Sequence, residues 1–203
     1  MKIAILGATG RVGSRLIAEL TRRGHQITAV SRTPSRPPSP NQVTSVTADA
    51  QNPDQLKRTI EGNDAVIHAA RFVDTDPAKI IAATKAARVP RLLVVGGAAS
   101  LETAPGKRLL DSPHFPAEYK AEATAGAAFL DALKNEQELN WTYLSPARDF
   151  EPGERTGKFR LGKDQILSTP DGQSRISMED FAIAMADEIE KPAHTRQRFT
   201  VGY

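Results

Sequence analysis

The chain has 203 residues, of which 39% are apolar and 25% charged, and its formal net charge is +3. This length suits one domain with a full core, and the lack of Cys excludes a disulfide scaffold and a Cys-ligated metal site. The basic residues are scattered, so no nucleic-acid partner is expected, and no apolar run approaches the ~18 residues of a membrane span. A strand-like run begins almost at Met1, which predicts a cytoplasmic protein without a signal peptide.

Strand-like runs alternate with helical patterns along the chain. Strands are predicted at residues 3–6, 26–30, 43–47, 65–68, 91–95, 141–144 and 198–201. Helices are predicted at residues 12–23, 53–60, 76–87, 116–135 and 178–189, with Asn52 and Asp76 as caps. The Pro-rich residues 33–40 predict a surface loop, because Pro lacks a backbone N–H group.

This alternation predicts an α/β fold of the Rossmann type, a doubly wound parallel sheet with helices on both faces. Residues 150–177 are rich in Gly, Pro and charge, with short strand-like pieces at 158–161, 165–168 and 175–177. We therefore expect a single domain of this fold over residues 1–203. Residues of about 150–177 would form a small C-terminal lobe on the substrate side.

Glycines stand at positions 7, 10 and 13, between the first predicted strand and the first predicted helix. Gly7 permits a tight turn, Gly10 lets the backbone approach a pyrophosphate, and Gly13 lets the helix pack on the sheet. The helix N-terminus offers unpaired N–H groups and a partial positive charge to the anion. The turn therefore predicts a dinucleotide site, whose candidate cofactor-binding residues here are Gly7, Ala8, Thr9, Gly10, Arg11 and Val12.

The end of the second predicted strand bears on the choice of cofactor. An NAD site places an acidic residue about 20 residues after the turn, for the ribose 2′-hydroxyl. No acidic residue occurs here between Glu19 and Asp49, and the strand ends in Ser31-Arg32. A guanidinium matches phosphate oxygens bidentately, and Arg11 and Arg36 could reach the same phosphate. The sequence therefore favours NADP(H) over NAD(H).

Four motifs, in this order, resemble one family. They are Gly-Ala-Thr-Gly-Arg-Val-Gly at 7–13, Val-Val-Gly-Gly-Ala-Ala-Ser-Leu at 94–101, Trp-Thr-Tyr-Leu-Ser-Pro at 141–146 and Arg-Ile-Ser-Met-Glu-Asp-Phe-Ala at 175–182. Together they resemble the atypical short-chain dehydrogenase/reductases of the NADH-flavin reductase type, which are related to biliverdin reductase B and to NmrA-like redox sensors.

The resemblance implies further cofactor contacts. Asp49 and Ala50 would lie beside the adenine, and Ala69, Ala70 and Arg71 would pass under the cofactor ribose. Gly96 follows the fifth predicted strand at the mouth of the sheet, where ligands bind, and Pro146 closes the sixth, after which relatives place residues along the nicotinamide. His68 follows an apolar run, so we interpret it as a structural histidine. Phe150 is either a core residue or a stacking partner for a substrate.

The catalytic residues are less clear from the sequence. Typical superfamily members use a Tyr-x-x-x-Lys pair, but Tyr119 is followed at once by Lys120, and position 123 is Ala. Ser100 and Tyr119 are the catalytic candidates, with Ser100 as a contact to a substrate oxygen or simply a loop-turning residue. No metal site is expected, because the four histidines lie far apart in the sequence.

Two functions lead at this point, and a third, epimerase or dehydratase chemistry on a sugar nucleotide, ranks last because the chain is short for a substrate domain and lacks the Tyr/Lys pair. The first is an NADPH-dependent oxidoreductase that transfers hydride to a small-molecule acceptor, a flavin or a quinone, for which the protein needs little acid–base machinery. The second is a non-enzymatic NADP(H)-binding redox sensor of the NmrA-like type. The sequence leaves the acceptor and the oligomeric state undetermined.

Overall fold

The central feature of the molecule is an eight-stranded sheet in the order β10-β12-β8-β5-β4-β1-β2-β3. The structure is a computed structural model, and it describes residues 1–33 and 41–203. The strands of this sheet, in chain order, are β1 (Lys2–Leu6), β2 (Gln26–Ser31), β3 (Val43–Thr47), β4 (Ala65–His68), β5 (Arg91–Val95), β8 (Asn140–Pro146), β10 (Arg160–Gly162) and β12 (Gln197–Gly202). Neighbouring strands are parallel except at the edge, where β10 runs antiparallel to β12.

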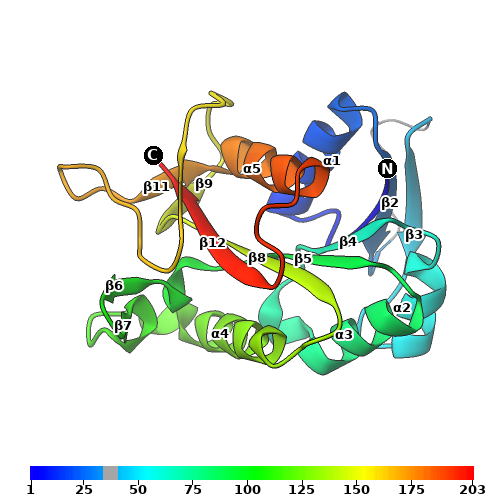
Figure 1. The fold of residues 1–203 in the computed structure, drawn as a ribbon, viewed down its shortest axis with the longest axis horizontal. Helices are drawn as coiled ribbons and strands as arrows, with labels where there is room; N and C mark the ends of the chain where they lie inside the picture. The colour runs from blue at the N-terminus through cyan, green and yellow to red at the C-terminus, as the bar shows by residue number, and fades with distance from the viewer. Residues whose placement is uncertain (34–40) are drawn as a thin grey trace.

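Helices cover both faces of this sheet (Figure 1). One face carries α1 (Arg11–Arg22) and α5 (Met178–Glu190), and the other carries α2 (Pro53–Ile60), α3 (Pro77–Ala86) and α4 (Lys120–Lys134). The two faces bury separate apolar cores, with Leu16 and Phe181 in one and Leu56 and Phe129 in the other. The central strands of the sheet are buried on both sides, and for this reason their sequences are continuous apolar runs. The predicted doubly wound Rossmann fold is confirmed.

Two helix starts follow directly from the sequence. The Asn52 side chain accepts a hydrogen bond from the Gln55 N–H group at 3.1 Å, and Pro53 opens α2. The Asp76 side chain accepts from the Ala78 N–H group at 2.9 Å and caps α3. Both caps satisfy N–H groups that a helix leaves without an internal partner, so the predicted caps are confirmed.

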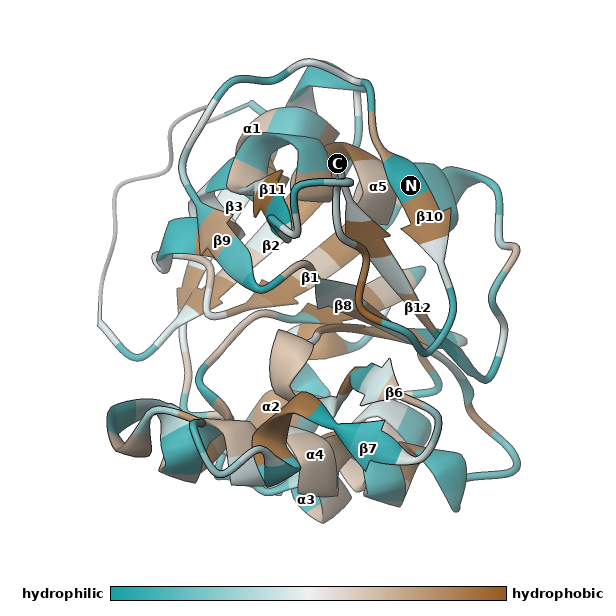
Figure 2. Cartoon of the chain, turned by 90° about the vertical axis from the view of Figure 1, so that its left-hand side faces the viewer, coloured by the Kyte–Doolittle hydropathy of each residue, from teal (hydrophilic) through white to brown (hydrophobic). Residues whose placement is uncertain are grey.

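Short elements complete the chain. The strands β9 (Asp149–Glu151) and β11 (Arg175–Ser177) pair in parallel, and β6 (Glu102–Ala104) pairs antiparallel with β7 (Lys107–Arg108). Single 3-10 turns are η1 (Phe72–Asp74), η2 (Ala98–Ser100), η3 (Leu109–Asp111) and η4 (Ala117–Tyr119). Figure 2 shows β9 and β11 on the α1 and α5 side of the sheet, and β6 and β7 on the α4 side.

Three predicted elements need correction. Residues 165–168 form no strand, because Gln165 makes only an isolated parallel bridge with Glu102 of β6 and the Thr169 N–H group turns back to donate to the Gln173 carbonyl. The helix predicted over residues 116–135 begins only at Lys120, since the 3-10 turn η4 precedes it. Residues 160–162, predicted in the lobe, instead add β10 to the central sheet.

The Pro-rich loop prediction lies largely outside the described residues, as does Arg36. Within the described part of the chain, no helix is both long enough and apolar enough to cross a membrane.

Candidate functional site

The turn between β1 and α1 is built from glycines that touch backbone. Gly7 has a φ of 82°, in the left-handed region that favours glycine, and a Cβ atom there would lie 2.6 Å from the Ala69 carbonyl oxygen. A Cβ atom on Gly13 would overlap the Gly7 carbonyl oxygen. Gly10 precedes α1 without a side-chain cap, and the first turn of α1 contains no acidic residue. The N-terminus of α1 therefore fits an anion such as a pyrophosphate.

A cavity of about 190 Å³ lies beside this turn, at the carboxyl ends of β1, β2, β3 and β4. We name it the cofactor cavity. The predicted cofactor-binding residues that line it are Gly7, Thr9, Gly10, Ser31, Arg32, Asp49, Ala50, Ala69, Ala70 and Arg71. Its remaining lining residues, which the sequence analysis missed, are Leu6, Val30, Ala48, Asp74 and Thr75. Small side chains and backbone dominate this wall, so an adenosine could approach closely.

Five predicted cofactor-binding residues lie outside this cavity. Ala8 is 3% exposed, behind the turn. Arg11 and Val12 begin α1, and Gly96 and Pro146 stand at the ends of β5 and β8. The structure thus gathers ten of the predicted cofactor-binding residues in one cavity and leaves these five outside its lining.

Arg32 follows β2 and is one of the residues that line the cofactor cavity. Its Nη2 atom lies 3.3 Å from Oδ2 of Asp74, and its side chain is 70% exposed. Arg32 thus lies in the cavity lining directly after β2, and its contact to a 2′-phosphate stays a prediction. The structure also places an acidic partner there, from η1, which no spacing rule in the sequence indicated.

His68 does not line the cofactor cavity, but it contacts Thr75, which does. The ring is fully buried, packs against Phe72 and Phe129, and has its Nε2 atom 3.1 Å from the Thr75 hydroxyl. Burial lowers the pKa of His68 to about 4, so the imidazole is neutral at physiological pH. Its contacts are those of a structural residue that fixes Thr75, a residue of the cavity wall.

The two catalytic candidates lie on different segments. Ser100 ends η2, is 7% exposed, and has its Oγ atom 3.4 Å from Nη1 of Arg198. Tyr119 ends η4 and is 62% exposed. Among the described residues no hydrogen bond joins these two side chains, and neither lines the cofactor cavity.

Tyr143 supports the loop after β5, a role that the sequence analysis missed. Its hydroxyl donates to the Gly126 carbonyl at 3.1 Å and accepts from the Gly97 N–H group at 3.3 Å. Burial raises the pKa of Tyr143 above its usual value, so this phenol stays protonated. An aromatic residue inside a strand is the only sequence signal for this position, and it does not distinguish a loop support from a core residue.

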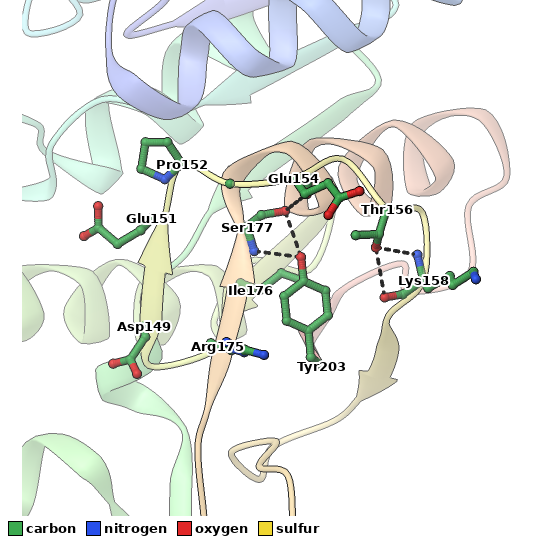
Figure 3. Close-up of a pocket in the computed structure, with 11 residues that line it drawn as sticks. Asp149, Glu151, Pro152, Glu154, Thr156, Lys158, Arg175, Ile176, Ser177 and Tyr203 are labelled. Atoms are coloured by element: carbon green, nitrogen blue, oxygen red, sulfur yellow. Dashed lines mark hydrogen bonds between the residues drawn. The ribbon is translucent and has the colours of Figure 1, made fainter.

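A second cavity, of about 600 Å³, lies around β9 and β11, and we name it the lobe cavity (Figure 3). The Tyr203 ring stands in its centre, with its hydroxyl 2.9 Å from Oγ of Ser177. Glu151 lines the cavity and pairs with Arg11 of the phosphate turn, which connects the lobe to the cofactor side. The ring of Phe150 packs against the ring of Phe181, with 4.8 Å between their centroids, as the ring of a core residue does.

The chain is similar to known proteins over nearly its whole length. The family model described as NAD(P)H-binding matches residues 7–192. The uncharacterized protein YwnB of Bacillus subtilis (strain 168) is 38% identical over 214 residues, which cover 99% of this chain and 98% of YwnB.

Two solved structures are also similar over the whole chain. A "putative epimerase" of Bacteroides thetaiotaomicron is 42% identical with a TM-score of 0.94, covering 100% of this chain and 96% of that one. A "putative NADH-flavin reductase" of Streptococcus pneumoniae is 36% identical with a TM-score of 0.86, covering 100% and 99%. The chain therefore belongs to the NAD(P)H-binding family.

Proposed function

We propose that the protein is an NADPH-dependent oxidoreductase that transfers hydride to a flavin or a quinone-like acceptor. The observation that carries the choice of NADPH is Arg32, whose guanidinium lines the cofactor cavity at the end of β2. A guanidinium there favours a 2′-phosphate over a 2′-hydroxyl. The name of the Streptococcus pneumoniae relative supports a flavin as the acceptor.

In this proposal each part of the site has a distinct task. The cofactor cavity holds the adenosine half, and the N–H groups at the start of α1 bind the pyrophosphate. The bound nicotinamide supplies the hydride near Gly96 and Pro146, at the ends of β5 and β8. Ser100 and Tyr119 are the proposed contacts on the acceptor side. An electron-poor acceptor takes its proton from solvent, so the protein chiefly positions the two rings.

The direct test is NADPH oxidation by the purified protein with FMN and with a simple quinone, each compared with NADH. We expect turnover with NADPH to exceed turnover with NADH. If NADPH and NADP⁺ bind in the same samples but neither acceptor supports turnover, the enzyme proposal for these acceptors is contradicted. The NADP(H)-binding redox sensor would then be favoured.

Arg32→Glu tests the proposed phosphate contact. We expect the affinity for NADPH to fall at least tenfold, because a charge-assisted bond worth about 1.5–3 kcal/mol is replaced by repulsion. The affinity for NADH should change less than threefold. Titrations that follow nicotinamide fluorescence give both dissociation constants. Equal losses for the two cofactors would contradict the assignment of Arg32 to the 2′-phosphate.

A further inference from the structure

The arginines in and beside the cofactor cavity share one feature. Each pairs with a carboxylate from another element: Arg11 with Glu151, Arg32 with Asp74, and Arg71 with Glu122. A carboxylate and a phosphate use the same donors of a guanidinium. A cofactor phosphate that approaches one of these arginines therefore meets a group of like charge beside it.

Asp74 differs from the other two carboxylates because it lines the cofactor cavity itself. Its side chain is 34% exposed, and its Oδ2 atom lies 3.3 Å from Nη2 of Arg32. Glu122 instead binds the N–H groups of Phe72 and Val73, at 2.7 Å and 3.1 Å, and lies outside the cavity lining. Asp74 is thus the carboxylate that faces both the cavity and the proposed 2′-phosphate contact.

The backbone holds Asp74 in place independently of its carboxylate. The Asp74 N–H group donates to the Arg71 carbonyl at 3.3 Å, and the Asp74 carbonyl accepts from Nε2 of Gln51 at 2.6 Å. Arg32 is the one side-chain partner of the Asp74 carboxylate among the described residues. Replacing Asp74 with Asn would therefore remove the charge and keep the shape and the backbone contacts.

We propose that Asp74 is a specificity-determining residue, which competes with the 2′-phosphate of NADP(H) for Arg32 and so limits the preference for NADP(H) over NAD(H). The inference rests on the proposed function, in which Arg32 binds that phosphate. Two effects weaken binding of the 2′-phosphate. The phosphate must displace the Asp74 carboxylate from Arg32, and it then lies beside that carboxylate, which repels it. The 2′-hydroxyl of NAD(H) carries no charge and meets neither penalty.

The test is the selectivity ratio of Asp74→Asn, the dissociation constant for NADH divided by that for NADPH. Nicotinamide fluorescence measures both constants without requiring turnover. We expect the ratio to rise about fivefold, the effect of releasing one exposed ion pair, chiefly through tighter binding of NADPH. The matched control is Asp54→Asn, which removes an exposed carboxylate of α2 outside the cavity and should leave the ratio unchanged.

Measuring the effect of Asp74→Asn both in the wild type and in the Arg32→Ala variant distinguishes the proposal for Arg32 from the proposal for Asp74. If Arg32→Ala alone does not weaken NADPH binding, the proposed role of Arg32 fails, and the competition for Arg32 fails with it. If Arg32→Ala weakens NADPH binding but Asp74→Asn does not raise the ratio, only the proposal for Asp74 is overturned. An equal rise in the ratio with and without Arg32 would also overturn it, because competition requires the guanidinium.

Discussion

Gly96→Ala is expected to destabilise the protein by about 3 kcal/mol, whereas Gly97→Ala should change its stability by less than about 0.5 kcal/mol. A Cβ atom on Gly96 would overlap the Tyr143 ring and lie 2.8 Å from the Leu144 carbonyl oxygen. The Gly96 N–H group donates to that same carbonyl at 2.8 Å, so the backbone cannot move away cheaply. At Gly97 a Cβ atom would meet no atom within 4 Å.

The two alanine variants form a matched pair, since they add the same methyl group one residue apart. Urea-induced unfolding at neutral pH gives both free energies of unfolding. Because Gly96 stands at the proposed nicotinamide end, Gly96→Ala should also weaken cofactor binding in the fraction that remains folded. Equal stabilities for the two variants would show that Tyr143 yields to the extra methyl group, which contradicts its role as a rigid support.

Glu19→Gln is expected to cost about 3 kcal/mol of stability at pH 7. Burial raises the pKa of Glu19, but hydrogen bonds from Arg155, Arg22 and Arg23 outweigh it and hold the pKa at about 2. The side chain is only 4% exposed, so solvent screens these ion pairs little. The Arg155 contact also ties the segment after β9 to α1.

The stabilisation by Glu19 depends on pH in a defined direction. It is fully present above the carboxyl's ordinary pKa of 4.5 and is lost as the pH falls toward about 2, where the folded state also takes up the proton. The difference between wild type and Glu19→Gln should therefore be roughly halved at about pH 3. Glu138→Gln is the control, because the Glu138 side chain is 77% exposed and its pair with Lys85 should contribute less than about 1 kcal/mol. A difference that stays constant with pH would refute this account.

The sequence predicts the central sheet and its helices well because their signals are local. Apolar runs of strand length mark the buried strands, and Asn52-Pro53 and Asp76-Pro77 mark two helix starts that the structure confirms. The short strands β6, β7 and β9 were not predicted. They have two or three residues each and largely exposed side chains, so they leave little hydrophobic pattern to detect.

The residues of the candidate site also fall into those that the local sequence predicts and those that it does not. The glycine turn and Arg32 follow from spacing along the chain, because turn, strand and helix are consecutive. Asp74 and Tyr143 do not, since their partners Arg32 and Gly97 come from distant parts of the sequence. Only the fold brings such pairs together, and a single sequence contains no spacing rule for them.

The two small sheets have a consequence for how this scaffold can change. The β6–β7 pair lies within the connection from β5 to α4, and β9 and β11 lie within the connection from β8 to α5. The cofactor cavity is lined instead by residues at the ends of β1 to β4 and in the segments that directly follow these strands. Under the proposed function, insertions or exchanges in these two connections are expected to alter the acceptor side while the cofactor cavity stays constant. We therefore expect changes that alter the proposed acceptor, whether engineered or evolved, to fall in these two connections.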